Sequence, residues 1–182
     1  MHEMTTANLR SAFGGESMAH MRYKIWSGKA VEEGFANVAR LFTAIASAEQ
    51  AHATNHFETM RDAAGGFLVA SMAGFGDGNT SQNLAGAIEG EEFEINDMYP
   101  AYLEVAKMQS ESQASLSFHY ALSAEKIHSR MYRDAKQAVD AGRDVELGPV
   151  QICSVCGYTH EGDVPDKCPV CGKGPEKFTT FA

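Results

Sequence analysis

Glutamates interrupt the apolar faces of four long helical stretches, and this feature constrains the fold of the chain most. Apolar residues recur every three or four positions over about residues 6–29, 33–64, 80–110 and 112–141, which predicts four amphipathic helices. Five glutamates lie on the same faces: Glu16, Glu49, Glu91, Glu94 and Glu125. An ionised carboxylate on a buried face needs a partner of opposite charge, and no basic residue shares these faces.

Histidines supply the remaining metal-binding side chains on these faces. Two Glu-x-x-His pairs are present, Glu49 with His52 and Glu125 with His128. Residues three apart on a helix share one face, so both side chains of a pair can reach the same ion. A lone glutamate precedes each pair at a similar distance, since Glu16 lies 33 residues before Glu49 and Glu91 lies 34 before Glu125. The repetition predicts a pseudo-symmetric site for two metal ions inside a helical bundle, with donors that suit iron or manganese.

The connection between the second and third helical stretches covers residues 65–79 and is rich in glycine. It is too long for a tight hairpin turn, so we expect either a crossover connection or a hinge that swaps helices between two chains. Thr80 is the expected N-cap of the third helix, Pro100 is expected to kink it, and Gly142 is expected to end the fourth helix. These features favour a mainly α, ferritin-like four-helix bundle over residues 1–145.

A second, smaller domain is expected over residues 146–182, because it contains all four cysteines of the chain. They form two CxxCG motifs made of Cys153, Cys156, Cys168 and Cys171. Two such knuckles can enclose one tetrahedral ion with four thiolates, and both zinc and iron suit that geometry. A redox centre in the bundle needs electrons, which an iron–thiolate site can carry one at a time and zinc cannot, so the combination favours iron.

Composition restricts the possible partners of the chain. The 182 residues carry a formal net charge of −9 and no cluster of Lys and Arg, which argues against nucleic acids and anionic membranes as partners. The N-terminal residues lack the pattern of a secretory signal, and no stretch has the length of a membrane-spanning helix. Together with the metal-site arrangement of the cysteines, this predicts a cytoplasmic protein.

These motifs resemble those of the rubrerythrin family over nearly the whole chain. The shared features are Gly-Gly-Glu-Ser at residues 14–17, Tyr23, both Glu-x-x-His pairs, Glu91-x-x-Glu94 followed by Met98-Tyr99-Pro100, and a terminal rubredoxin-like CxxCGY…CPxCG. Glu94 is the specific element of the resemblance, because other ferritin-like di-iron proteins typically use four glutamates and two histidines.

The resemblance implies a role for each motif residue. Two irons would be bound in the bundle by Glu16, Glu49, His52, Glu91, Glu94, Glu125 and His128. Glu49 and Glu125 would bridge the irons, and Glu94 would exchange with His52 as a ligand between the oxidised and reduced states. Tyr23 and Tyr99 would hydrogen-bond the carboxylates and, with Glu94, are the expected catalytic side chains. The cysteines would bind a third iron, which zinc can replace in recombinant protein.

The implied activity is NADH-linked reduction of hydrogen peroxide to water in defence against oxidative stress. Electrons would come from a donor protein such as rubredoxin or an NADH-dependent reductase, because the chain has no Gly-rich dinucleotide fingerprint of its own. They would pass through the rubredoxin-like iron, often that of a neighbouring subunit in a head-to-tail homodimer or larger homo-oligomer. Two alternatives remain open from sequence: a ferroxidase or iron-handling protein of the ferritin-like class, and a non-enzymatic electron carrier.

Overall fold

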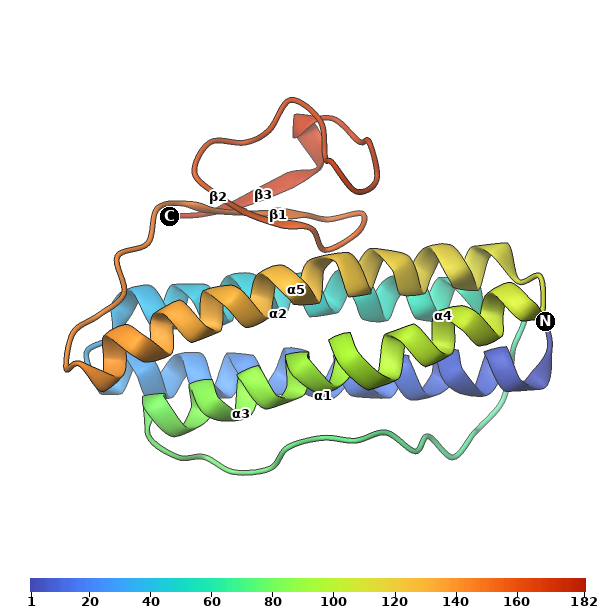
Figure 1. Ribbon diagram of the computed structural model, residues 1–182, viewed down its shortest axis with the longest axis horizontal. Helices are drawn as coiled ribbons and strands as arrows, with labels where there is room; N and C mark the ends of the chain where they lie inside the picture. The colour runs from blue at the N-terminus through green and yellow to red at the C-terminus, as the bar shows by residue number, and fades with distance from the viewer.

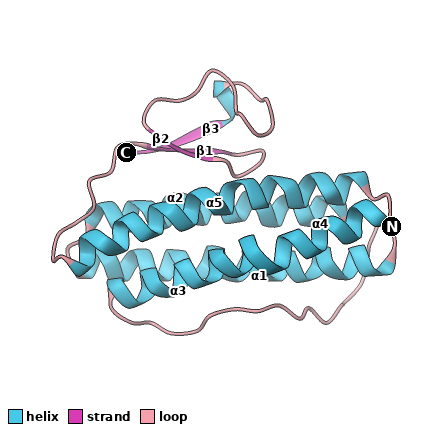
Figure 2. Ribbon diagram, in the orientation of Figure 1, coloured by secondary structure: helices cyan, strands magenta, loops and turns pink.

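The computed structural model describes residues 1–182 as a long helical bundle with a small sheet module lying along one side (Figure 1). The helices are α1 (Glu3–Glu32), α2 (Ala36–Thr59), α3 (Thr80–Phe93), the π-helical turn η1 (Glu94–Met98), α4 (Tyr99–Met108) and α5 (Ser112–Asp140). Because α3, η1 and α4 follow one another along a single rod, the bundle has four rods, as predicted (Figure 2). None of the helices combines the length and apolar character needed to cross a lipid bilayer.

The bundle core consists of two apolar clusters separated by a polar layer. The larger cluster includes Phe42 and Ile45 of α2, and the smaller one includes Leu9 of α1 and Phe118 of α5, all fully buried. In three of the four rods a glutamate lies between residues of the two clusters, and in α2 Glu49 directly follows the last residue of the larger cluster. The carboxylates therefore form a layer inside the bundle, where no solvent compensates their charge.

The third rod begins at Asn79 and not at the expected cap Thr80. The Asn79 side chain accepts a hydrogen bond from the Gln82 backbone at 2.9 Å, and the Gln82 side chain accepts one from the Asn79 backbone at 3.0 Å. This reciprocal pair satisfies two backbone donors that a helix start leaves without partners. Thr80 is instead the first helical residue, and its backbone N–H is bound by the Glu33 carboxylate at 2.8 Å.

The break expected near Pro100 takes the form of the π turn that precedes it. Proline has no N–H to donate to the carbonyl one turn back, so the regular helical ladder cannot run unbroken through this point. The chain inserts the wide turn Glu94–Met98 and resumes as α4, with Pro100 in its first turn. A regular helix would turn Tyr99 about 80° away from the face of Glu91, and one extra residue in a π turn restores the shared face.

Residues 65–79 form a long connection between α2 and α3. The segment leaves the end of α2 and runs along the outside of the bundle to the start of α3 at the opposite end (Figure 1). Trp26 donates its indole N–H to the Gly76 carbonyl at 3.0 Å, and the Arg10 guanidinium lies 4.3 Å from the centre of the Phe67 ring. The second helix ends at Thr59 and not near residue 64, because residues 60–62 already turn into this connection.

The cysteine module follows α5, which ends at Asp140 with Gly142 in the left-handed region, as predicted from the sequence. Its strands are β1 (Val150–Cys153), β2 (Thr159–Glu161) and β3 (Phe178–Phe181), which pair antiparallel in the order β2-β1-β3. The central strand β1 is buried along its whole length and faces α2. The module therefore lies on the bundle of its own chain (Figure 2).

Candidate metal centres

The buried polar layer of the bundle contains two groups of metal-binding side chains. One group consists of Glu16, Glu49, His52 and Glu125, and the other of Glu49, Glu91, Glu125 and His128. In each group the candidate ligand atoms lie within 4.8 Å of one another, and every member is buried. The two groups share Glu49 and Glu125, so they form one double site to which α1, α2, α3 and α5 all contribute.

The shared glutamates each face both histidines. His52 Nδ1 lies 2.9 Å from Glu49 Oε2 and 2.9 Å from Glu125 Oε1. His128 Nδ1 lies 2.7 Å from Glu125 Oε2 and 3.3 Å from Glu49 Oε1. Each of the two carboxylates thus directs one oxygen toward the half that contains His52 and the other oxygen toward the half that contains His128. A ligand that bridges two metals requires this arrangement.

The electrostatics of the layer call for cations. Four of its carboxylate oxygens are buried without a hydrogen-bond partner, namely Glu16 Oε2, Glu49 Oε1, Glu91 Oε2 and Glu125 Oε1. Burial, reinforced by repulsion from neighbouring carboxylates, raises the pKa of Glu16 and Glu91 well above the ordinary value. Burial alone would lower the pKa of His128, but the facing carboxylates Glu125 and Glu49 outweigh it and raise that pKa to about 9. Oxygen-rich donors with one imidazole per half fit two iron or manganese ions.

Two tyrosines hold the glutamates that are not shared. The Tyr23 hydroxyl donates to Glu91 Oε1 at 2.7 Å, and the Tyr99 hydroxyl donates to Glu16 Oε1. Both rings are fully buried or nearly so. The two halves of the site are therefore alike in their outer contacts as well as in their ligands, and each tyrosine fixes the rotamer of one carboxylate.

Glu94 lies outside both groups. It is half-buried at the start of the π turn and lines an open cavity of about 700 Å³ under the crossover segment, together with Arg22, Trp26 and Gly90. Among the seven predicted ligands it is the one that the structure leaves at the edge of the site, where solvent reaches it. The histidine predicted to alternate with it, His52, is the one placed inside.

The four cysteines converge at the tip of the module. Cys153 Sγ lies 3.6 Å from Cys171 Sγ, and Cys156 Sγ lies 3.5 Å from Cys168 Sγ, with no disulfide among them. These separations approach the edge of a tetrahedron around an ion with metal–sulfur bonds of about 2.3 Å. Each knuckle closes with a glycine N–H that donates to the carbonyl of its first cysteine, at 2.8 Å in one knuckle and 2.9 Å in the other.

One knuckle rests directly on the carboxylate site. A Cβ atom on Gly157, the residue after Cys156, would lie 2.0 Å from His52 Nε2, and the φ angle of Gly157 is +76°. Glycine is therefore required there for two reasons, the left-handed backbone and the close approach of the imidazole. Beside it, the Thr159 hydroxyl lies 2.8 Å from His128 Nε2, so the module touches both histidines of the double site.

Two further residues contact the site that the sequence motifs did not indicate. His56 belongs to neither metal-binding group and forms hydrogen bonds with Ser117 and Tyr99. Its position four residues after His52, on the same helix face, was the available indication. Thr159 gave no indication at all, because its contact with His128 depends on how the module packs.

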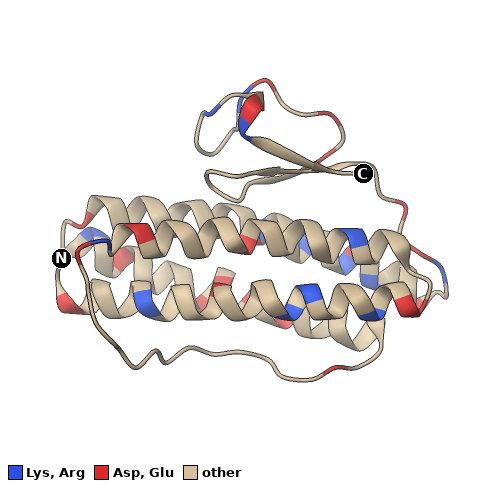
Figure 3. Cartoon of the chain, turned by 180° about the vertical axis from the view of Figure 1, so that it is seen from behind, with Lys and Arg blue, Asp and Glu red and all other residues tan.

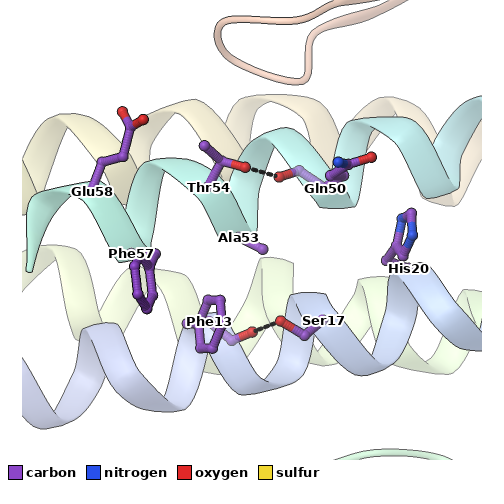
Figure 4. A pocket seen from close by; sticks show the side chains of 8 residues that line it. All are labelled: Phe13, Ser17, His20, Gln50, Ala53, Thr54, Phe57 and Glu58. Carbon is purple, nitrogen blue, oxygen red and sulfur yellow. Dashed lines mark hydrogen bonds between the residues drawn. The ribbon is translucent and has the colours of Figure 1, made fainter. Parts of the chain in front are cut away.

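A groove on the outer face between α1 and α2 has a volume of about 500 Å³ (Figure 4). Phe13 and Phe57 form its apolar end with ring centres 5.3 Å apart, and His20 lies at its other end. None of the metal-binding side chains lines it. Acidic positions occur in the middle of the bundle as well as at its ends (Figure 3), and both carboxylate–histidine groups lie in the interior layer.

Comparisons with known proteins cover both parts of the chain. The family model described as Rubrerythrin matches residues 7–136, and the model described as Rubrerythrin, rubredoxin-like domain, matches residues 151–179. Rubrerythrin-2 of Clostridium acetobutylicum is 47% identical over 178 residues, which span 98% of this chain and 97% of that protein. Nigerythrin of Nitratidesulfovibrio vulgaris is 33% identical over 177 residues, which span 97% of this chain and 86% of that protein.

Solved structures agree with the sequence comparisons. Nigerythrin in its fully reduced, all-ferrous state superposes with a TM-score of 0.85 at 32% sequence identity. The superposition covers 97% of this chain and 86% of that one, so it includes the bundle and the cysteine module together.

Proposed function

Because the chain belongs to the rubrerythrin family and carries that family's rubredoxin-like domain, we propose that it reduces hydrogen peroxide to water in defence against oxidative stress. One observation carries the proposal. The knuckle that binds iron through Cys156 rests on His52 of the carboxylate site, so an electron-carrying centre and a two-metal centre meet within one chain. Storage or simple electron carriage would not need that junction.

The cofactors are two non-haem irons in the bundle and one iron in the four-cysteine site. When bound, the di-iron centre supplies two electrons to a peroxide, and the cysteine iron carries electrons one at a time. We propose that Glu49 and Glu125 bridge the two irons, in keeping with the way each directs its oxygens to both halves. Glu16 with His52, and Glu91 with His128, would complete the two halves.

The position of Glu94 supports a ligand that moves. With His52 inside the double site and Glu94 at the rim of the open cavity, the side chains have the arrangement that the family resemblance assigns to the reduced state. We propose that Glu94 enters the site and replaces His52 upon oxidation. The cavity in front of Glu94 is then the route by which peroxide reaches the buried layer, and Arg22 on its wall keeps a positive charge beside that route.

The proposed electron route passes through the contact between the cysteine knuckle and His52. Cys156 is bonded to Gly157, and the Gly157 backbone packs against the His52 ring, so the path from thiolate to imidazole crosses one non-bonded contact. We propose that a separate donor protein, such as a rubredoxin or an NADH-dependent reductase, supplies the electrons to the cysteine iron. A homodimer or larger homo-oligomer remains our expectation for the assembly.

The proposal is tested with iron-loaded, chemically reduced protein mixed with hydrogen peroxide in the absence of oxygen. We expect one peroxide to be consumed for every two electrons, with the visible absorbance of the ferric cysteine site rising as electrons leave it. Rapid reaction with oxygen and ferrous iron, but slow reaction with peroxide, would favour a ferroxidase. Reversible reduction without any consumption of peroxide would favour an electron carrier.

Glu94→Ala tests the assignment of the moving ligand. Removing this carboxylate is expected to slow peroxide turnover about 10²-fold, as loss of a properly placed catalytic group does, while leaving the absorbance of the cysteine site intact. Glu104→Ala is the matched control, because Glu104 makes only an exposed ion pair with Lys107. Turnover equal in the two variants would overturn the role of Glu94.

A further inference from the structure

We propose that Ser117, His56 and Tyr99 form a path that delivers protons from a surface cavity to Glu16 at the di-iron site. The inference rests on the proposed function, because reduction of hydrogen peroxide to two waters consumes two protons with its two electrons. These protons must reach carboxylates inside the bundle, and Glu16 is fully buried. The path would supply the half of the site that Glu16 and His52 form.

His56 is the central element of the path. It lies on α2 one turn beyond His52, is fully buried, and belongs to neither metal-binding group. Its Nδ1 lies 2.7 Å from Ser117 Oγ on α5, and its Nε2 lies 3.0 Å from the Tyr99 hydroxyl at the start of α4. Tyr99 in turn donates to Glu16 Oε1. Four groups from four helices thus form one unbroken chain of hydrogen bonds.

The donors in this series of hydrogen bonds all point toward Glu16. A carboxylate that binds metal can only accept, so the single hydroxyl proton of Tyr99 is directed at Glu16. The Tyr99 oxygen must then accept from Nε2–H of His56, which leaves Nδ1 without a proton to accept from Ser117.

The outer end of the path opens to solvent. Ser117 lines an open surface cavity of about 440 Å³ near the end of α2 and the start of α5. The acidic residues Glu58, Asp62 and Glu111 line the same cavity, so carboxyl groups and water are both available next to the Ser117 hydroxyl. The path therefore begins at the surface and ends at a predicted iron ligand without a gap.

The other half of the site lacks such a path, although its ligands are arranged alike. Tyr23 donates to Glu91 as Tyr99 does to Glu16. The Tyr23 ring, however, is surrounded by the aromatic rings of Trp26, Phe42 and Tyr132, with centres 5.4–5.9 Å away. No histidine side chain is hydrogen-bonded to the Tyr23 hydroxyl. This difference between two otherwise similar halves is what singles out His56.

One passage moves one proton and leaves no net charge on the intermediate groups. A proton enters at Ser117 Oγ, the hydroxyl proton of Ser117 passes to His56 Nδ1, and the Nε2 proton passes to the Tyr99 oxygen. The Tyr99 proton then reaches Glu16 Oε1. Before the next passage the hydroxyls rotate back, and the ring releases its Nδ1 proton to water and takes up another at Nε2, an exchange that adds no net proton. Two passages match the two electrons that the di-iron centre supplies to one peroxide.

The first test compares two histidine variants of the iron-loaded full chain. His56→Phe keeps an aromatic ring of similar size and removes both nitrogens, and His20→Phe makes the same change at a histidine that lines the outer groove in Figure 4. We expect His56→Phe to slow the oxidation of the reduced centre by peroxide about 10²-fold, with iron content unchanged. His20→Phe is expected to react like the wild type.

Heavy water separates proton delivery from packing. In His56→Phe, proton arrival becomes the slow step, so the ratio of rates in H2O and D2O should rise above that of the wild type. Ser117→Ala, which keeps the core packing, should shift the ratio in the same direction but less, because a water molecule can occupy the place of the lost hydroxyl. A wild-type rate in His56→Phe, or a slower rate with an unchanged ratio, would overturn the proposal.

A second measurement is independent of turnover. Nitrogen NMR of the full chain loaded with zinc reports which nitrogen of His56 carries the proton. We expect the proton on Nε2, and a proton on Nδ1 or a charged ring would overturn the oriented path. If the wild type leaves peroxide untouched, the proposed function fails, and peroxide as the acceptor of these protons fails with it. The ring tautomer then still decides whether the oriented path exists.

Discussion

At the scale of single residues, the site depends on side chains that hold the ligands as much as on the ligands themselves. Tyr23 and Tyr99 each donate to a glutamate that has one oxygen in the metal-binding group. Without its tyrosine, a buried carboxylate would lose the bond that orients it and would keep the cost of its desolvation. The tyrosines are therefore expected to govern how tightly each half binds metal.

Tyr23→Phe is predicted to weaken iron binding in the half formed by Glu91 and His128 by about 10-fold to 100-fold, the usual effect of removing a bond to a metal ligand. Competition with a chelator, followed by iron analysis, measures the change. Tyr102→Phe is the control, because the Tyr102 hydroxyl bonds Ser11 at 3.0 Å and touches no ligand. Equal iron retention by both variants would show that Tyr23 acts only through packing.

The residues of the metal site could be proposed from sequence because they repeat along helices of known period. Glu-x-x-His needs only one helix to bring its two side chains together, so the spacing is sufficient. His56 and Thr159 have their partners on other elements, 61 and 31 residues away along the chain. No local period connects such residues, and only tertiary packing shows that they meet.

At the scale of elements, the π turn is the feature that the helical pattern did not foresee. Pro100 indicated that the helix would be disturbed, but not that the disturbance would be an inserted residue in the turn before it. The turn allows Glu91 and Tyr99, eight positions apart, to face the same interior layer. Similarly, Thr80 and Asn79 are both acceptable caps by residue type, and the bond to Gln82 decided between them.

A single-residue deletion tests this account of the π turn. Deleting Asn96, an exposed residue within the turn, is predicted to restore a regular helix in which Tyr99 keeps its face, at a cost of about 1–2 kcal/mol. Deleting the exposed His119 from α5 should rotate Glu125 and His128 about 100° relative to Phe118 and abolish iron binding. For each deletion, thermal unfolding measures the change in stability and iron analysis measures the metal that remains bound. Loss of iron binding in the two deletions alike would contradict the prediction.

At the scale of the whole molecule, the cysteine module packs against the bundle through one contact surface. Gly157 fits against His52, and Thr159 reaches His128, so docking of the module touches both histidines of the double site. Both parts and their order could be predicted from the sequence, because each contains a metal-binding pattern of its own. The position of the module on the bundle could not be predicted, since no motif encodes the docking of two folded surfaces.

The two knuckle glycines provide a matched test of this docking. Both have positive φ, +76° at Gly157 and +72° at Gly172, so alanine at either should cost about 1–2 kcal/mol in backbone strain. Only at Gly157 would the added methyl collide with the bundle, because nothing lies within 4 Å of the corresponding position at Gly172. Gly157→Ala is predicted to slow the peroxide-driven oxidation of the cysteine iron about tenfold or more, as small misplacements do, and Gly172→Ala is not.

The placement of the module on its own bundle has a kinetic consequence. A redox partner that diffuses to an enzyme is diluted with it, and its rate of delivery falls with concentration. A donor joined to its acceptor through the same polypeptide is present at an effective concentration that dilution does not change, on the order of millimolar for short tethers. If the cysteine iron is the last electron donor, as proposed, that transfer is unimolecular, and dilution of the protein does not slow it.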